Sequence, residues 1–148
     1  MIICLPHAQK ETAKRIHAVF QKAYGIEAEL IGLLHFPPLD RSIENIQNSG
    51  TIFFGVPQKA QLTAVIEISR QKYQLDIDSL VVDPNHFRQG QARLLLTHVL
   101  NNLQWKSASV ETALANKPAI ALYQQLGFTM TDEWHTDEGI RKVLLCKL

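Results

Sequence analysis

The feature that most constrains the fold is a strand–helix–strand succession between residues 77 and 112. An apolar strand pattern over residues 75–82 precedes an amphipathic helical pattern that starts near Gly90, and a second strand pattern follows at residues 107–112. Neighbouring strands that are connected through a helix pair in parallel, and the crossover is almost always right-handed. The chain is therefore predicted to contain a parallel strand pair in the middle of its sheet.

Before this unit, the pattern changes from helices to strands. A short strand is expected at residues 2–5, followed by a helix that ends at Gly25 and by a second, short helix with Asp40 as its N-cap. Strand patterns at residues 51–56 and 62–68 lie close in sequence to the first strand of the parallel pair. Short connections favour antiparallel pairing, so these three strands are predicted to form a meander.

After the parallel unit, one more helix and two strands are expected. Asn116 is a suitable N-cap for a helix over residues 117–126, and Gly127 is placed to end it. Residues 128–130 and 140–148 predict two closing strands. The predicted fold class is therefore α/β (α+β), with a mixed, mostly antiparallel sheet of about seven strands and about four flanking helices.

Length and composition limit the class of protein. A chain of 148 residues with 46% hydrophobic and 20% charged residues fits one domain, residues 1–148, and excludes a disordered, collagen-like or coiled-coil chain. The net charge of +1 gives no sign of a nucleic-acid or membrane partner. The charge is unevenly distributed, however, because no acidic residue occurs between Asp83 and Glu111.

Signals for targeting and for metal binding are missing from the sequence. The N-terminus lacks the basic flank and the small-residue cleavage site of a signal peptide, and no apolar run approaches the roughly 18 residues of a spanning helix. Cys4 and Cys146 lie far apart, and the six histidines show no metal-ligand spacing. We therefore expect a cytoplasmic protein with reduced cysteines and no metal site.

The segment from Leu80 to Ala92 carries the clearest chemical signal. A strand runs through a loop into a helix that starts with Gly90-x-Ala92, where small residues let a ligand approach the backbone. Free N–H groups and the helix dipole favour a phosphate there, and Arg88 and Arg93 can add charged hydrogen bonds. The alternative is an ordinary strand–turn–helix with two solvated arginines. The motifs of P-loop, dinucleotide-binding and G-x-S-x-G hydrolase proteins are absent.

Two motifs resemble those of the GNAT superfamily of N-acetyltransferases. Val82-x-Pro84 followed by Arg88-Gln89-Gly90-Gln91-Ala92 looks like the family's acetyl-CoA motif, and N-K-P-A-I-A-L-Y-Q-Q-L-G-F at residues 116–128 is similar to its N-x-x-A-x-x-L-Y-x-x-x-G-F segment. Both occur in the family's order and spacing. One position differs, because the family usually has Arg or Gln where this chain has Phe87. The difference concerns one side-chain phosphate contact and leaves the backbone cradle intact.

The resemblance implies a fold in which two central strands splay apart in a V. The pantetheine arm of acetyl-CoA, the co-substrate, would lie in that gap. The implied cofactor-binding residues come from the strand beside the arm, the pyrophosphate loop and the last helix: Leu80, Val81, Val82, Arg88, Gln89, Gly90, Gln91, Ala92, Arg93, Asn116 and Tyr123. Asn116 would hold the arm, cap its helix, or do both.

The reaction implied by the resemblance is direct attack of a primary amine on the thioester carbonyl in a ternary complex. A backbone N–H near Val82 would stabilise the oxyanion, an effect worth about 3 kcal/mol. Tyr123 would donate a proton to the departing thiolate, because a phenol with a pKa of about 10 is protonated at neutral pH. A packed helix tyrosine without a chemical role is the alternative interpretation of Tyr123.

An amine that is protonated at neutral pH must lose a proton before it attacks. Glu67 is the candidate catalytic base, because it lies in an apolar strand where burial would raise its pKa. Asp78 and Glu111 are rivals on neighbouring strands, and a chain of water molecules could also serve. For each carboxylate, pairing with a nearby Arg or Lys is an equally good interpretation.

The acceptor and the partners are less defined. By the same resemblance, residues 35–38 and the stretch from Asp132 to Glu138 border the acceptor site, where aromatic and acidic side chains suit a cationic amine of a small molecule or a peptide. A solvated turn is the alternative. The rival functions are a non-catalytic acyl-CoA-binding or sensing module and a purely structural domain. The closing strand at residues 140–148 is compatible with a homodimer.

Overall fold

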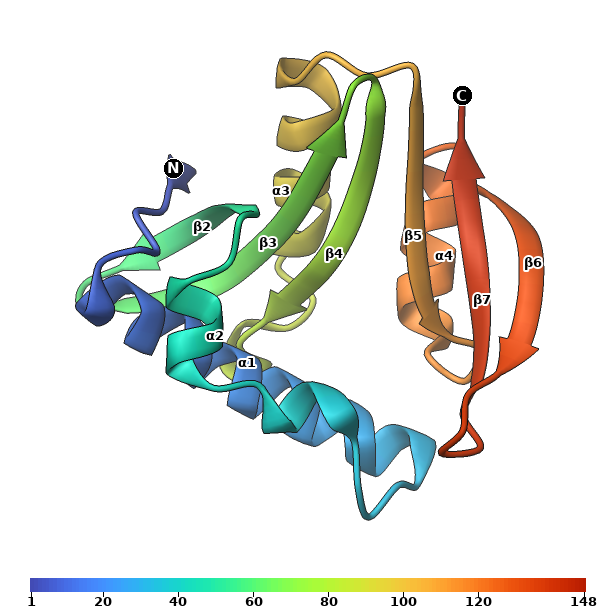
Figure 1. Cartoon of the computed structure of the whole chain (residues 1–148), viewed down its shortest axis with the longest axis horizontal. Coiled ribbons are helices and arrows are strands. Elements are labelled where there is room, and N and C mark those ends of the chain that lie inside the picture. The colour runs from blue at the N-terminus through green and yellow to red at the C-terminus, as the bar shows by residue number, and fades with distance from the viewer.

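The computed structural model describes all 148 residues, which form one seven-stranded sheet with four α-helices. The strands are β1 (Ile3–Cys4), β2 (Ile52–Gln58), β3 (Gln61–Gln71), β4 (Gln74–Val82), β5 (Ser107–Ala113), β6 (Thr129–His135) and β7 (Arg141–Lys147). The helices are α1 (Lys10–Ile31), α2 (Ile43–Gln47), α3 (Gln91–Asn102) and α4 (Lys117–Gln125), with short 3-10 segments η1 (Pro37–Asp40) and η2 (Pro84–His86). The strand order is β1-β2-β3-β4-β5-β7-β6 (Figure 1), which confirms the predicted α+β class.

The predicted parallel pair is present at the centre of the sheet. All other strand pairs are antiparallel, whereas β4 and β5 run parallel and α3 connects them. The two strands pair over a short distance, from Gln74 opposite Ser107 to Ile77 opposite Val110. Beyond Ile77 they diverge, as Figure 1 shows. This divergence is the V-shaped splay that the resemblance implies.

A β-bulge in β4 marks the point of divergence. Glu67 of β3 lies opposite Ser79, and Ile68 lies opposite Ile77, so that Asp78 is an extra residue without a partner on β3. A bulge bends its strand and increases the local twist. The bulge therefore turns β4 away from β5.

Helices cover both faces of the sheet. On one face, α3 and α4 contribute residues such as Leu95 and Ile120 to the larger core cluster, and on the other face α1 contributes Phe20 to a second cluster. Side chains of β3 alternate between the two: Ile66 belongs to the first cluster and Val65 to the second. None of the helices combines the length and the apolar character that crossing a membrane requires.

The predicted end of the first helix at Gly25 is wrong. Helix α1 continues to Ile31 and ends at Gly32, whose left-handed backbone (φ 73°) lets its N–H bond to the carbonyl oxygens of Ala28 and Glu29. A glycine inside a helix costs only about 1 kcal/mol, and burial of Ala28 beyond it helps to offset that cost. The residues after Gly25 are consequently helical rather than part of a loop.

The predicted cap of the second helix is also wrong. The Ser42 hydroxyl caps α2 by accepting a hydrogen bond from the Asn45 N–H at 3.0 Å. Asp40 lies in η1 and pairs with His35 at 3.2 Å on the surface. Two consecutive prolines start η1, so the chain completes a 3-10 turn before α2 begins.

Candidate active site

The splay leaves backbone hydrogen-bonding groups of β4 without a strand partner. The Asp83 N–H donates to the carbonyl oxygen of Thr63 on β3 at 2.7 Å. Because successive residues direct their N–H groups to opposite sides of a strand, the N–H groups of Leu80 and Val82 point away from β3. On that side β5 has already diverged. A bound molecule can therefore take the place of the missing strand.

A cavity of about 490 Å³, here called the cofactor cavity, lies between this segment and the start of α3. Most of the predicted cofactor residues line it: Leu80, Val81, Val82, Arg88, Gly90, Gln91, Ala92, Arg93 and Asn116. Residues of α1 and α4, among them Ile26 and Leu122, complete its walls. Gln89 is exposed and does not line the cavity, so the structure brings the rest of the loop together without it.

The loop before α3 has a backbone suited to an anion. Gly90 is the N-cap of α3, with φ of 77° and no side chain that occupies the free N–H groups. A Cβ at Gly90 would meet no atom within 4 Å, so the backbone there is open to a ligand. Gln91 adds a buried Oε1 that has no hydrogen-bond partner. The N–H groups fit a pyrophosphate, and the Gln91 oxygen fits an amide N–H of the same ligand.

Side chains give this cavity its positive charge. Arg88 and Arg93 both line it, and Arg93 also donates a hydrogen bond to Gln125 of α4. Phe87 lines the cavity as well and is 45% exposed. The position where the family usually has Arg or Gln thus contributes an apolar surface rather than a phosphate contact.

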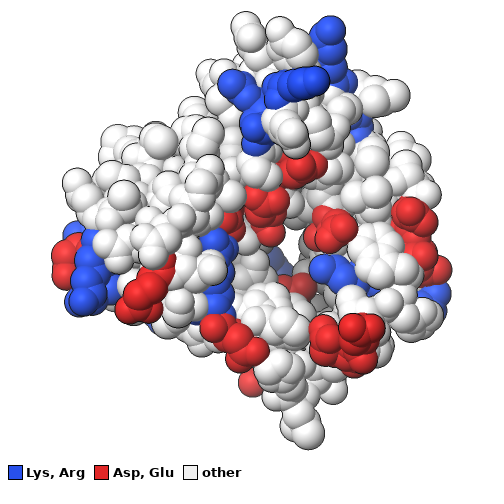
Figure 2. Space-filling model, in the orientation of Figure 1, with Lys and Arg blue, Asp and Glu red and all other residues white.

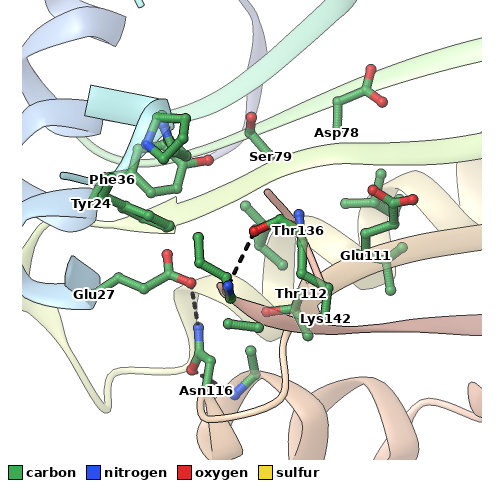
Figure 3. Close-up of a pocket in the computed structure, with 18 of the residues that line it drawn as sticks. Tyr24, Glu27, Phe36, Asp78, Ser79, Glu111, Thr112, Asn116, Thr136 and Lys142 are labelled. Carbon is green, nitrogen blue, oxygen red and sulfur yellow. Dashed lines mark hydrogen bonds between the residues drawn. The ribbon is translucent and has the colours of Figure 1, made fainter. Parts of the chain in front are cut away.

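A second cavity, of about 480 Å³ and here called the acceptor cavity, lies at the splay between β4 and β5 (Figure 3). Its aromatic and proline surface comes from Tyr24 and from Phe36, Pro37 and Pro38, so three of the four residues predicted at 35–38 line this cavity and His35 does not. Of the predicted stretch from Asp132 to Glu138, Thr136 and Glu138 line the cavity and the other side chains do not.

Acidic side chains dominate the acceptor cavity. Four carboxylates from different parts of the chain line it: Glu27, Asp78, Glu111 and Glu138. Its two cationic residues are Lys142 and Arg41, and Arg41 is already paired with a buried glutamate at 2.6 Å. Figure 2 shows acidic side chains gathered around the opening in the middle of this face. The cavity is therefore suited to a cation.

The two cavities share the residues Glu27, Leu80 and Asn116. Asn116 caps α4 as predicted, because its Oδ1 accepts the Ala119 N–H at 3.4 Å, and its Nδ2 donates to Glu27 Oε1 at 3.1 Å. Burial raises the pKa of Glu27, although Asn116 and Lys142 oppose this. A carboxylate with a raised pKa thus lies where the two cavities adjoin.

Tyr123 lines the acceptor cavity and not the cofactor cavity. It is 5% exposed and packs edge-on against Phe128, with the ring centroids 5.7 Å apart. Burial, with smaller contributions from Tyr24 and Glu27, raises the pKa of its hydroxyl well above the usual value. The phenol therefore stays protonated at neutral pH, as a proton donor must.

The expectation that burial raises the pKa of Glu67 is wrong. Its carboxylate is 3% exposed and accepts hydrogen bonds from Arg41 (2.6 and 2.9 Å), Thr51 (2.7 Å) and Ser79 (3.0 Å). Burial alone would raise the pKa, but these hydrogen bonds outweigh it and lower the pKa below its usual value. Glu67 lines neither cavity. It is the Arg-paired carboxylate of the alternative interpretation.

The two rival carboxylates do line the acceptor cavity. Asp78 occupies the bulge of β4, and burial, helped by the nearby Glu67 and Asp76, raises its pKa. Glu111 lies on β5 and is exposed. Neither carboxylate lines the cofactor cavity.

Two residues of α1, Tyr24 and Glu27, are parts of the site that the sequence analysis missed. Burial raises the pKa of Tyr24 to about 12. Glu27 lies beyond Gly25, the predicted end of the first helix, and therefore outside the predicted helical face. The missed signal is helical spacing, since Phe20, Tyr24 and Glu27 follow one another at intervals of four and three residues and so share one helix face.

Both motifs and the splay agree with one family model. Residues 35–145 match the model of the acetyltransferase (GNAT) domain. The chain belongs to the GNAT acetyltransferase family. The matched segment begins after α1, so Tyr24 and Glu27 precede it.

Curated proteins similar to this GNAT chain include one from Bacillus subtilis (strain 168). That protein, UPF0157 protein YqkA, is 36% identical over 141 residues, which are 95% of this chain and 41% of YqkA. The ribosomal protein bS18-alanine N-acetyltransferase of Escherichia coli (strain K12) is 28% identical over 96 residues, 63% of this chain and 65% of that protein. The chain thus spans less than two thirds of the length of either relative.

Solved structures share the GNAT fold over nearly the whole chain. The ribosomal-protein-S18-alanine N-acetyltransferase from Escherichia coli has a TM-score of 0.77 at 22% identity, covering 99% of this chain and 92% of that chain. The PaiA N-acetyltransferase from Thermoplasma acidophilum, in complex with coenzyme A, has a TM-score of 0.79 at 15% identity, covering 99% and 97%. At these identities the likeness shows the fold.

Proposed function

We propose that this GNAT protein is an N-acetyltransferase that moves an acetyl group from acetyl-CoA to a primary amine in a ternary complex. The observation that carries the proposal is the pair of adjoining cavities at the splay of β4 and β5. One has a backbone anion cradle with two arginines, and the other is acidic. The curated N-acetyltransferase relative and the coenzyme A complex of a protein with this fold support it.

The residues of the cofactor cavity fit acetyl-CoA. When bound, acetyl-CoA would supply an acetyl group that is activated as a thioester. The start of α3, with Arg88 and Arg93, would hold the pyrophosphate, and the N–H groups of Leu80 and Val82 would hold the arm along β4. The N–H near Val82 would also stabilise the oxyanion.

Tyr123 is the proposed proton donor to the leaving sulfur. Tyr123 lines the acceptor cavity, and its raised pKa keeps its hydroxyl protonated at neutral pH. Because α4 begins at the Asn116 cap, the same short helix links this donor to the junction of the two cavities. The helix therefore orients two groups of the site at once.

The proposed acceptor is a cationic primary amine. The carboxylates of the acceptor cavity favour an ammonium group, and Tyr24 and Phe36 offer aromatic surface to its apolar part. By its name, the Escherichia coli relative acetylates an alanine of a ribosomal protein. Peptide amines and small-molecule amines are therefore the two acceptor classes to compare.

Thermal unfolding with acetyl-CoA and a thiol-release assay with a panel of amines test this function. Acetyl-CoA at 100 times its Kd should stabilise the fold by about 2.7 kcal/mol, and a cationic amine should release free thiol. Absence of stabilisation at saturating acetyl-CoA would refute the function. Stabilisation without thiol release from any amine would instead support an acyl-CoA-binding module.

A further inference from the structure

Glu27 is the ionisable group at the junction of the two cavities. Of the residues that line both cavities, Leu80 is apolar and Asn116 carries a neutral amide. If acetyl transfer proceeds as proposed above, the amine nitrogen and the thioester carbon must meet near this junction. We propose that Glu27 is the catalytic base that takes a proton from the acceptor ammonium, an inference that rests on the proposed function.

The Glu27 carboxylate has one oxygen held and one oxygen free. Oε1 accepts the hydrogen bond from Asn116 Nδ2 at 3.1 Å, whereas Oε2 has no hydrogen-bond partner in the protein. The carboxylate lies between Tyr24 and Asn116 at the wall of the acceptor cavity (Figure 3). Asn116 is itself fixed as the cap of α4. The base is thus oriented by a rigid element and keeps an oxygen for the acceptor.

The surroundings of Glu27 make its carboxylate a better proton acceptor. Burial is the largest influence and raises its pKa, while Asn116 and the ammonium of Lys142 on β7 oppose it. The other titratable groups around it, Tyr24 on α1 and Tyr123 on α4, have raised pKa values and are neutral at neutral pH. A carboxylate whose pKa is closer to the working pH accepts a proton more readily than an ordinary one.

The other carboxylates are less well placed to remove a proton from the amine. Asp78, Glu111 and Glu138 are exposed and do not reach the junction of the two cavities, whereas Glu27 is partly buried there. Glu67 lines neither cavity, and its oxygens already accept four hydrogen bonds. Asp78, Glu111 and Glu138 are positioned to attract an ammonium, and Glu27 lies where the ammonium would react.

The step balances with the groups present. The acceptor enters as R–NH₃⁺, and Glu27 Oε2 takes one proton, which frees the electron pair of R–NH₂. The C–N bond forms as the C–S bond breaks. Tyr123 gives its proton to the sulfur, and the second proton lost by the nitrogen replaces it. R–NH₃⁺ and the acetyl thioester thus become the N-acetyl amine, the free thiol and one proton, which passes from Glu27 to solvent.

The variant Glu27→Gln isolates proton transfer, because the amide keeps the side-chain length and an oxygen for the Asn116 hydrogen bond. We expect kcat/KM for a cationic amine at neutral pH to fall about a hundredfold, with the acetyl-CoA thermal shift unchanged. Wild-type activity should level off above the pKa of Glu27 and decline below it, whereas the variant depends on the free-amine fraction and should keep rising with pH toward the pKa of the amine. Glu29→Gln, on the exposed side of α1 and outside both cavities, is the matched control and should stay active.

A second acceptor separates a base from a purely structural role. An amine whose pKa lies below the assay pH arrives without the extra proton, so its turnover should fall by no more than about fivefold in Glu27→Gln. Equal losses with both amines, or an unchanged pH profile, would overturn the proposal. If wild type transfers acetyl groups and Glu27→Gln does so normally, only the base is wrong. If wild type transfers to no amine, the proposed function itself fails.

Discussion

The two cavities have nearly the same volume, about 490 and 480 Å³, but they are built differently. The cofactor cavity takes most of its polar groups from one continuous segment, residues 80–93, and many of them belong to the backbone. The acceptor cavity takes its side chains from several elements that lie far apart in the sequence: α1, η1, β4, β5, α4, β7 and the loop before β7. A backbone site needs small residues at set spacings and so leaves a motif, whereas a site of scattered side chains leaves none.

The cavities also differ in charge. Arg88 and Arg93 make the cofactor cavity basic apart from the shared Glu27, and carboxylates make the acceptor cavity acidic. An anionic and a cationic substrate can therefore occupy neighbouring cavities without competing for the same one. If each cavity binds its own substrate, a substitution in the wall of one cavity should change the affinity for that substrate and leave the affinity for the other substrate unchanged.

The largest effect should come from Tyr123→Phe, which removes the proposed proton donor. We expect kcat to fall about 10²-fold to 10³-fold, because an unprotonated thiolate leaves poorly, with little change in either KM. Steady-state thiol release measures both constants. Tyr73→Phe, at an exposed tyrosine outside the site, serves as the control. Unchanged turnover in Tyr123→Phe would show that Tyr123 is a packing residue.

The next largest effect should come from Glu67→Gln, which breaks the ion pair that Glu67 forms with Arg41, a residue of the acceptor cavity. Arg41 would lose its charged partner, and we expect the free energy of unfolding in urea to fall by about 2 kcal/mol at neutral pH. The folded pKa of Glu67 lies below the unfolded value of about 4.3, so its contribution is complete above that pH and is lost as the pH falls through the folded pKa. The difference between the two proteins should therefore shrink in acid. A constant difference down to low pH would contradict this account.

A smaller effect is expected at the backbone cradle from Gly90→Ala. A left-handed φ of 77° costs an alanine about 1 kcal/mol, and the new Cβ would stand in open space beside the proposed anion cradle, so we expect the Kd for acetyl-CoA to rise about tenfold. The KM for the amine should not change. Gly139→Ala, with φ of 82° and nothing within 4 Å of its Cβ, carries the same strain away from the cofactor. Equal Kd values for acetyl-CoA in the two variants would show that the backbone at Gly90 does not contribute to cofactor binding.

The smallest effect should come from Glu138→Gln at the rim of the acceptor cavity. Its carboxylate is exposed, so we expect the KM for a cationic amine to rise only about twofold to threefold, with kcat unchanged and the effect disappearing in high salt. Asp137→Asn removes the neighbouring charge outside the cavity and is the matched control. The same KM change in both variants would show that net charge, and not the cavity wall, attracts the amine.

Much of the fold can be predicted from local signals. The parallel pair follows from the strand–helix–strand order, and the Asn116 cap follows from residue type and position. The end of α1 cannot be predicted in this way, because Gly25 offers a local reason to stop that the helix does not follow. The lowered pKa of Glu67 cannot be predicted from its apolar neighbours in sequence either. Its hydrogen-bond donors Arg41, Thr51 and Ser79 come from distant parts of the chain.

By itself, the amino-acid sequence determined the order of elements, the glycine turn that starts α3 and the helix that carries Tyr123, because each depends on contacts within a few residues. Only the tertiary structure decided which carboxylate lies at the junction of the two cavities. Glu67 and Glu27 are 40 residues apart. Folding surrounds the first with donors that lower its pKa and leaves the second half-buried with a free oxygen and a raised pKa. A pKa depends on burial and on partners brought from distant strands and helices, and these exist only once the chain has folded.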